Sequence, residues 1–446
     1  MKILFIACYS PLINNSASIE TLQYLNNLAK IDENEVHLLT VNFPKNSIYY
    51  DEYILSMLNE KVKMHIISGG KIFEKIMPKK PSNKAAVNSS QNNKSFIKSM
   101  LKKGKSIIAV PDMYFNWAKA ASKYGIELMK KEKFDVMFSM HEPPSSHICA
   151  MKIKEEFKDL PWVTYWSDPW LKDSTRENIS PVRRKYEQSF ERKVVNLSDR
   201  FIFVTKANRD DYVNSYNIPI EKTFIVTRGY DEKQYKEIKE KSNPKLIEKE
   251  KINFVYAGEI FSKLRNVNPF IDALNVIKNE NIDLYNKLNI MFFGNIDSDE
   301  VKNKLNAIDK VSVSPRIPYD EALGYMLNSQ VLLLFGNKNS KQIPAKVYDY
   351  FGAEGLIFVI LGDKNDPIKD VVKNKEKCIV VNNNVDEIVN GINKIASMIE
   401  LGIKHGAIEE YKWQYISKRL NDILRVYASL RSFTPYCPRF PKPPID

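Results

Sequence analysis

The stretch that decides the fold is residues 341–355, which reads KQIPAKVYDYFGAEG. An apolar run from Val331 to Phe335 precedes it and is typical of a buried strand. Pro344 suits the first position of a helix, where its missing N–H costs nothing. The pattern therefore predicts a strand, a loop and a helix start that carries Lys346 and Asp349.

This helix start carries groups suited to phosphate and to hydroxyls. The first N–H groups of a helix are free to bind an anion, and Lys346 adds a mobile positive charge beside them. Asp349, one turn further on, can accept hydrogen bonds from sugar hydroxyls. The two side chains together predict a nucleotide-sugar site, and the alternative is an ion pair between them on an exposed face.

Apolar runs of this kind alternate with helical patterns along nearly the whole chain. The strand candidates form two series: 2–8, 35–42, 64–67, 134–139, 161–166, 200–205 and 223–227, then 252–257, 288–293, 331–335, 356–361 and 378–381. Continuous apolar strands separated by helices predict parallel sheets with helices on both faces. The fold class is therefore α/β, with two Rossmann-like parallel-sheet domains facing a cleft and ligands at the carboxyl ends of the strands.

A charged stretch, 231–251, has almost no apolar periodicity and is predicted to be a linker. Residues 1–230 then form the first domain and 231–407 the second. The last long helix, about 408–430, is expected to pack back on the first domain. Residues 431–446 form a proline-rich tail, to which we assign no function.

Composition limits the possible functions. The 446 residues, 43% of them hydrophobic, are ample for two domains with cores, and the net charge of +13 favours an anionic partner. The four cysteines lack metal or disulfide spacing, which predicts reduced thiols in a cytoplasmic protein. No apolar run approaches the roughly 20 residues of a spanning helix. The first residues are predicted to form a strand rather than a signal peptide.

Residues 71–105 differ from the rest of the chain because they hold ten lysines and one acid, Glu74. Their central part, 81–95, is rich in Ser, Asn and Lys and is predicted to be flexible. Residues 96–103 alternate apolar side chains with lysines, as in a short amphipathic helix that binds an anionic membrane. The alternative is a solvated insertion that binds nothing.

Several stretches match one family in order. They are the opening strand, loop and helix of residues 1–30, the loops SMHEPPSSH (139–147) and YWSDPW (165–170), the turn TRGYD (227–231), YAG (256–258) with Lys263 and Arg265, and PAKVYDY (344–350). Over about residues 1–430 the chain resembles bacterial glycosyltransferase family 4, whose members have the GT-B fold and are retaining, nucleotide-sugar-dependent enzymes.

The resemblance implies roles in binding the sugar donor. Arg265 and Lys346 would stabilise the leaving diphosphate, with Lys263 in reserve, and no metal or other cofactor is expected. The other expected donor-binding residues are Asp349 for the ribose, Gly258 for close backbone approach, Arg316 and Ile317 for the base, and Pro344 and Tyr348 in the donor helix. For Arg265 the alternative is a surface cation.

The resemblance also places Ser16, His141, His147 and Ser167 at the acceptor side or in the cleft. Asp168 would position the acceptor hydroxyl or the transferred sugar, and its alternative is a helix cap. Both histidines are expected on a loop that opens on the cleft, although a lone histidine is more often structural.

The chain departs from the family pattern at four places. The family's usual acid eight residues before Asp349 is replaced by Lys341, and Asp349 itself stands where glutamate is usual. The glycine–arginine pair of the donor domain reads Gly258-Glu259, and Ser167 replaces the cleft histidine. Members with this form of donor helix commonly lack the first acid, so activity is still expected.

Residues 297–299 read Asp-Ser-Asp, which resembles a metal site of another glycosyltransferase fold. A helical pattern follows directly, so helix capping is the preferred interpretation. We therefore expect a glycosyltransferase that moves a sugar to a glycan or lipid-linked glycan acceptor in surface polysaccharide biosynthesis, in the cytoplasm or at the inner face of the membrane.

Two alternatives remain open. The same fold can support a nucleotide-sugar epimerase or hydrolase, which uses acids and histidines for proton transfer. The net charge is also compatible with a basic lipid- or nucleic-acid-binding protein, although no nucleic-acid motif of known spacing is present and no nucleic acid is expected as a partner.

Overall fold

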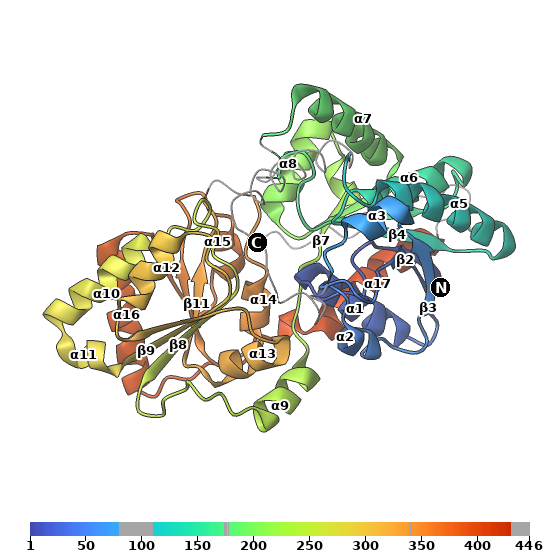
Figure 1. Ribbon diagram of the computed structural model, residues 1–446. Helices are drawn as coiled ribbons and strands as arrows, with labels where there is room; N and C mark the ends of the chain where they lie inside the picture. The colour runs from blue at the N-terminus through green and yellow to red at the C-terminus, as the bar shows by residue number, and fades with distance from the viewer. Residues whose placement is uncertain (80–109, 174–175, 177, 339–340, 430–446) are drawn as a thin grey trace, which may run out of the picture. The chain divides into compact units, whose positions relative to one another are not determined.

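The computed structural model describes residues 1–79, 110–173, 176, 178–338 and 341–429. They form two compact units, each built around one parallel sheet (Figure 1). The first unit holds Met1–Phe203, Tyr212–Val226 and the chain from Ser417 onward, and the second holds Val204–Asp211 and Thr227–Ile416. The α/β class with two parallel sheets is therefore confirmed.

The first unit has a seven-stranded sheet with the order β3-β2-β1-β4-β5-β6-β7. Its strands are β1 (Lys2–Ile6), β2 (Glu35–Asn42), β3 (Lys63–Ser68), β4 (Val136–His141), β5 (Trp162–Trp166), β6 (Arg200–Phe203) and β7 (Thr223–Ile225). The strand order reverses between β1 and β4, where Ile3 pairs with Val136. Open parallel sheets bind ligands beside such a reversal.

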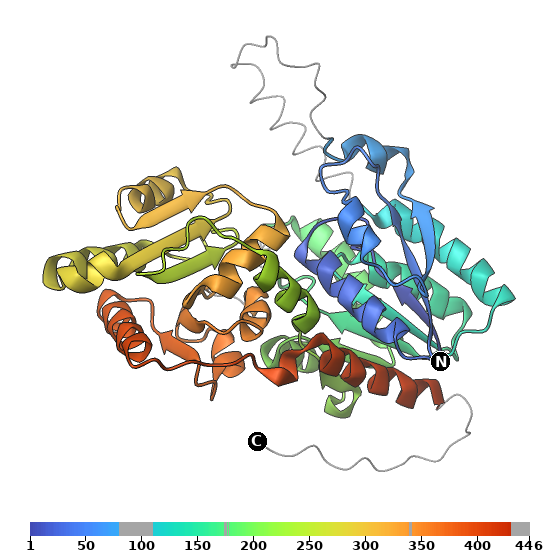
Figure 2. The same cartoon turned by 90° about the horizontal axis from the view of Figure 1, so that it is seen from below.

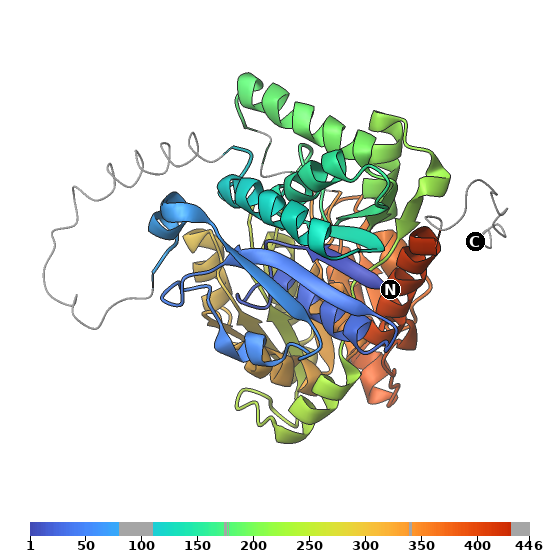
Figure 3. The same cartoon turned by 90° about the vertical axis from the view of Figure 1, so that its right-hand side faces the viewer.

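Helices cover both faces of this first sheet, as expected for continuous apolar strands. They are α1 (Ser16–Ala29), α2 (Glu52–Ser56), α3 (Gly70–Ile76), α5 (Phe115–Lys131), α6 (Ser145–Glu156) and α7 (Pro181–Leu197). Figure 3 shows α5 and α6 on one face and α1 on the other. The core of this unit includes four fully buried tryptophans, Trp117, Trp162, Trp166 and Trp170.

The second unit has a six-stranded sheet with the order β10-β9-β8-β11-β12-β13. Its strands are β8 (Ile252–Ala257), β9 (Leu288–Phe293), β10 (Val311–Ser314), β11 (Val331–Phe335), β12 (Leu356–Ile360) and β13 (Cys378–Val381). All five residues of β11 are buried, as the apolar run predicts. Here the strand order reverses between β8 and β11.

The helices of the second unit are α9 (Glu232–Lys241), α10 (Asn268–Glu280), α11 (Ile282–Lys287), α12 (Asp299–Asn306), α13 (Tyr319–Asn328), α14 (Lys346–Phe351), α15 (Ile368–Val372) and α16 (Val385–Glu400). Figure 1 shows α10 and α16 on one side of the sheet and α13 and α14 on the other. Ser298 Oγ accepts a hydrogen bond from Val301 N at 3.3 Å, so Ser298 caps α12. The predicted capping role of residues 297–299 is confirmed.

Two helices contain a boundary between the units: α8 (Lys206–Tyr216) and α17 (Trp413–Ser429). The long helix α17 is drawn in dark red in Figure 2. In the first unit, Asn34 Nδ2 donates to Asn421 Oδ1 at 2.8 Å, and Arg425 Nη2 pairs with Glu33 Oε2 at 2.9 Å. These contacts hold the C-terminal part of α17 on that unit.

The predicted linker at 231–251 is wrong in part, because residues 232–241 form α9. Asp231 caps this helix, and Tyr235 is its only buried side chain. One buried residue in ten leaves no visible apolar period, which is why the pattern is absent from the sequence.

Three predicted segments lie wholly outside the described residues: the flexible stretch 81–95, the amphipathic segment 96–103 and the proline-rich tail 431–446. Of the lysine-rich insertion, residues 71–79 are described, and they contain most of α3. Within the described ranges, no helix has both the length and the hydropathy needed to cross a bilayer.

Candidate functional site

The second sheet brings four predicted or new site residues together where its strand order reverses. Gly258 follows β8 directly, and Arg265 lies in the loop beyond it. Asn337 follows β11, and Lys346 begins the next helix, α14. Because carboxyl ends of parallel strands meet at one edge of the sheet, loops from β8 and β11 can converge there.

The Arg265 side chain is half-buried and is held by three acceptors. Its Nε donates to Asn337 Oδ1 at 3.0 Å, and its Nη1 donates to the Glu259 carbonyl at 2.6 Å and to Tyr256 Oη at 3.2 Å. None of the residues that the structure describes accepts a hydrogen bond from Nη2. The guanidinium is thus fixed through two nitrogens and presents the third to a ligand.

Lys346 lies beside this arginine. Its Nζ is 4.8 Å from the centre of the Tyr256 ring, and burial lowers the pKa of Lys346, with the charge of Arg265 acting in the same direction. A Cβ on Gly258 would lie 1.9 Å from that Nζ, and Gly258 has a φ of +154°. The space at Gly258, expected to admit a phosphate, is therefore occupied by the lysine ammonium.

The sequence predicted Pro344 as the first residue of the helix that carries Lys346, and the structure shows that this helix begins two residues later. The helix begins at Lys346 after Ala345, and the Pro344 carbonyl accepts a hydrogen bond from Val347 N at 3.2 Å in the turn before it. Sequence signals locate helix ends only to within a residue or two. Tyr348 is 1% exposed, and its ring packs 5.7 Å from that of Tyr411, so it contributes to the core.

Asp349 is half-buried on α14, one turn after Lys346. Burial raises the pKa of its carboxyl to about 6, while the positive charges of Arg228 and Lys346 act in the opposite direction. The Tyr235 hydroxyl donates to the Asp349 carbonyl at 3.2 Å, which ties α9 to α14. The exposed ion pair considered for Lys346 and Asp349 is wrong, because no ion pair joins them and neither side chain is exposed.

Three further predicted donor residues lie in two loops of the second unit. Lys263 is exposed in the loop after β8, and it has no hydrogen bond to Arg265 or Lys346. Arg316 is exposed and Ile317 half-buried in the loop after β10, an edge strand separated from β8 by β9. Both loops leave the same carboxyl edge of the parallel sheet.

The first unit places the predicted acceptor-side residues at the carboxyl edge of its own sheet. Ser167 and Asp168 follow β5, and Ser167 Oγ donates to the His141 carbonyl at 2.6 Å. Ser16 is the first residue of α1. The cap considered for Asp168 is not formed on the next α-helix, because Ser180 caps α7.

The histidines do not lie on an open loop, which corrects the prediction. His141 ends β4 and is 1% exposed, and His147 lies in α6 and is fully buried. Their rings pack against the Trp166 ring, at 5.7 Å and 4.5 Å between centres. Burial lowers the pKa of both, that of His147 to about 3, so both are neutral core residues.

Glu142, directly after β4, is a half-buried acid that the sequence did not single out. Burial is the main cause that raises the pKa of its carboxyl to about 8, and the negative charges of Asp168 and Asp173 raise it further. The positive charge of Arg176 lowers this pKa. A carboxyl with this pKa is mostly protonated at neutral pH. It can therefore donate as well as accept a proton beside Asp168.

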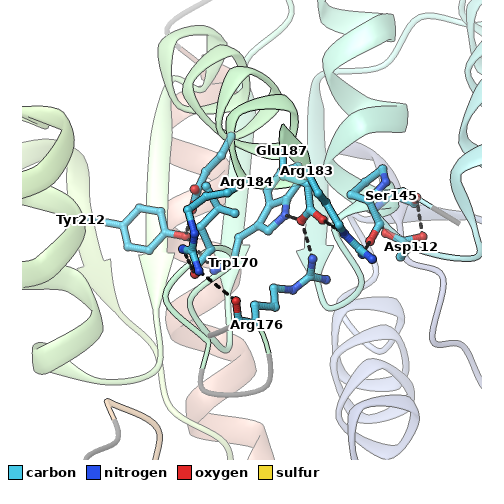
Figure 4. Close-up of polar contacts among 11 residues, drawn as sticks. Asp112, Ser145, Trp170, Arg176, Arg183, Arg184, Glu187 and Tyr212 are labelled. Atoms are coloured by element: carbon cyan, nitrogen blue, oxygen red, sulfur yellow. Dashed lines mark hydrogen bonds and ion pairs between the residues drawn. The ribbon is translucent and has the colours of Figure 1, made fainter. Parts of the chain in front are cut away.

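A buried ion-pair network holds the loop that carries Arg176 (Figure 4). Glu187, on α7, has no exposed surface and accepts hydrogen bonds from Trp170 Nε1 at 2.8 Å, from Arg183 Nε at 2.6 Å and from Arg176 Nη1. Arg183 Nη2 also donates to the Pro111 carbonyl at 2.8 Å. The network joins the loop after β5 to α7 and to the segment before α5.

Sequence reasoning missed four residues of these two edges: Glu142, Arg228, Tyr256 and Asn337. Each lies in or just after a correctly predicted strand or turn, so position alone offered a signal. These residues are distinguished by their burial and by their interactions with polar or charged side chains from other parts of the chain. Both features become visible only in the folded protein.

Among the described residues, one group of side chains has metal-ligand geometry. Potential ligand atoms of Glu35, His37 and Glu132 all lie within 4.8 Å of one another. Both carboxylates are already paired with lysines, because Lys2 Nζ lies 2.6 Å from Glu132 Oε2 and Lys63 Nζ lies 2.5 Å from Glu35 Oε1. We therefore read the group as a salt-bridge cluster.

Comparison with known proteins bears on the family resemblance and on the fold. Residues 90–234 match the family model described as Glycosyltransferase Family 4. The predicted resemblance to this family is confirmed. No curated protein matches the sequence significantly.

Solved structures share the fold over nearly the whole chain. Sucrose-phosphate synthase from Thermosynechococcus elongatus is 11% identical, with coverage of 96% of this chain and 99% of that one and a TM-score of 0.63. Anabaena HepE in complex with UDP is 12% identical, with coverage of 96% and 100% and a TM-score of 0.58. UDP-GlcNAc 2-epimerase from Neisseria meningitidis is 11% identical, with coverage of 96% and 100% and a TM-score of 0.55. Together they confirm the GT-B fold class.

Proposed function

We propose that this protein is a retaining glycosyltransferase that moves a sugar from a nucleoside diphosphate sugar to a glycan or lipid-linked glycan acceptor. The observation that carries the proposal is the pair of cations, Arg265 and Lys346, held side by side where the strand order of the second sheet reverses. Two fixed positive charges at this position suit the diphosphate that leaves when the sugar is transferred.

Each step of the proposed reaction uses side chains of the chain itself. Arg265 Nη2 and Lys346 Nζ would neutralise the charge that develops on the leaving diphosphate, so no metal is required for this task. Asp349 would accept hydrogen bonds from the ribose hydroxyls. In the first unit, Asp168 would orient the acceptor hydroxyl. Retention follows if the acceptor attacks from the side of the leaving group, whose phosphate then takes the hydroxyl proton.

A thermal-shift screen across nucleoside diphosphates and nucleotide sugars tests the donor. A bound donor raises the unfolding temperature because it binds only the folded state. The proposal fails if none of these compounds stabilises the protein. If anionic vesicles or nucleic acid then bind in a salt-sensitive way, a binding protein is the better description.

The Lys346→Ala variant tests the site itself. It should abolish transfer while the protein keeps the unfolding temperature of the wild type to within a few degrees, since the change removes a charge at the rim of the sheet. Lys302→Ala, an exposed lysine on α12, is the matched control and should transfer normally. Near-normal transfer by Lys346→Ala would exclude this lysine from the reaction.

One observation favours a second candidate, a nucleotide-sugar epimerase. Burial raises the pKa of the Glu142 carboxyl to about 8, and an acid with a pKa near neutral pH suits proton transfer to and from a sugar. The UDP-GlcNAc 2-epimerase with the same fold makes this class a concrete alternative. Isomerisation of the nucleotide sugar without any acceptor would establish it.

The proposal extends to the cellular setting. The net charge of +13 and the ten lysines in residues 71–105 support work at an anionic surface, the cytoplasmic face of the membrane, where lipid-linked acceptors of surface polysaccharide pathways are presented. Vesicle binding tests this part independently of the chemistry.

A further inference from the structure

Tyr256 lies beneath both cations of the donor site. It is the penultimate residue of β8 and is 1% exposed. Its ring packs against the rings of Phe292 and Phe335, each 5.6 Å away between centres, and those two rings lie 6.4 Å from each other. A ring enclosed in this way cannot turn or shift without disturbing β9 and β11, so its hydroxyl and its faces have defined directions.

The Tyr256 hydroxyl closes a triangle of hydrogen bonds with Arg265. It donates to the Glu259 carbonyl at 2.9 Å and accepts from Arg265 Nη1 at 3.2 Å. Arg265 Nη1 donates to the same carbonyl at 2.6 Å. Because Asn337 holds the Nε of the guanidinium at 3.0 Å, the plane of the group is set and Nη2 points away from these partners.

The Tyr256 ring supports the second cation. Lys346 Nζ lies 4.8 Å from the ring centre, within the range in which the negative face of an aromatic ring attracts an ammonium ion. The ammonium has little exposure to water, so this attraction compensates part of the lost hydration. Gly258 leaves the space through which the lysine reaches the ring.

We propose that Tyr256 is a positioning residue for the diphosphate of the nucleotide sugar, orienting Arg265 through its hydroxyl and carrying Lys346 on its ring. The inference rests on the proposed function and deepens it. One rigid side chain sets the distance and direction between two cations that come from different loops. The site is then ordered before the ligand arrives, so little ordering remains to be done on binding.

Tyr256→Phe removes the hydroxyl and keeps the ring. Its affinity for the nucleoside diphosphate that stabilises the wild type best, measured by titration calorimetry, should fall about 10-fold, as for loss of one hydrogen bond to a charged group. Affinity for the corresponding nucleoside, measured by competition, should not change. Tyr256→Leu removes the ring as well and should weaken diphosphate binding further.

Tyr285→Phe is the matched control, because Tyr285 is also buried in the second unit and its hydroxyl contacts Asp309, away from the site. It should bind like the wild type. If Tyr256→Phe does not fold, Asn337→Ala removes the other anchor of Arg265 and should show the same selective loss.

A double-mutant cycle of Tyr256→Phe with Arg265→Ala separates positioning from packing. If the hydroxyl acts through Arg265, Tyr256→Phe should change the diphosphate affinity little in the Arg265→Ala background. If the two residues act independently, the fold-losses of affinity in the single variants should multiply in the double variant. Independent effects, or equal losses for diphosphate and nucleoside, would overturn the inference while leaving the proposed function intact. A wild-type protein that binds no nucleoside diphosphate would overturn both.

Discussion

At the scale of single residues, burial shifts the charge state of the groups in the proposed donor site. Lys346 and Asp349 are three positions apart on one short helix, and burial shifts the pKa of each toward its neutral form. The neighbouring charges of Arg265 and Arg228 determine how far each shift goes. Ligand binding and protein stability are therefore linked to pH at this site.

Asp349 makes a prediction about stability. Its carboxyl has a pKa of about 6 in the folded protein and an ordinary value of 3.8 when exposed, so between these values the folded state binds more protons than the unfolded state. The free energy of unfolding should therefore fall as the pH rises from about 4 to about 6. Asp349→Asn should remove this part of the slope in urea unfolding at a series of pH values. An unchanged slope would contradict the raised pKa.

Gly258 makes a second prediction. Gly258→Ala should cost about 1–3 kcal/mol of unfolding free energy, because alanine is strained at a φ of +154°. It should also weaken nucleoside diphosphate binding, because the new Cβ would displace the Lys346 ammonium. Calorimetric titration and chemical unfolding measure the two effects. Gly406→Ala is the control, since no atom lies within 4 Å of a Cβ there.

At the scale of elements, the sequence predicted most strands to within two residues. The candidate runs 252–257, 288–293, 331–335 and 378–381 coincide with β8, β9, β11 and β13. β8, β9 and β11 lie inside the parallel sheet and are largely buried on both faces, so they are recognisable as apolar runs. β13 is an edge strand with Val380 exposed, but its four residues are all apolar. The helix α9 was missed for the opposite reason, because Tyr235 is its only buried side chain.

The network around Glu187 makes a prediction at this scale. Glu187→Gln removes a charge that two arginines face inside the protein, and should cost about 3–5 kcal/mol of unfolding free energy because their charges remain buried. Glu300→Gln removes an exposed partner of Lys304 on α12 and should cost at most about 0.5 kcal/mol. Equal costs in urea unfolding would show that the Glu187 network is not stabilising.

At the scale of the whole molecule, two parallel sheets each place loops at their carboxyl edges. The reversal of strand order between β8 and β11 brings Arg265 and Lys346 together at the proposed donor site, and that between β1 and β4 places Glu142 near the loop of Asp168. The fold is shared with solved structures that are only 11–12% identical. The same fold is therefore compatible with very different sequences.

The charge distribution makes the last prediction. The protein should sediment with vesicles that contain phosphatidylglycerol, less with pure phosphatidylcholine, and less as salt rises, because the attraction is electrostatic. Replacing Lys98, Lys102 and Lys103 by glutamine should weaken this binding. The same change at Lys245, Lys249 and Lys394, exposed lysines of the second unit, should not. Binding that ignores both lipid charge and salt would exclude the membrane role.

The amino-acid sequence alone was enough to predict the α/β class, the two series of strands, and a helix with Lys346 and Asp349 after a buried strand. Such features are local, since apolar runs and their spacing are set by neighbours in the chain. Only the tertiary structure showed that Tyr256 supports both cations, that Lys346 fills the space at Gly258 and that His141 and His147 are core residues. The burial, the pKa and the hydrogen-bond partners of a side chain depend on residues brought together from distant positions in the chain. A sequence pattern does not reveal which residues these are.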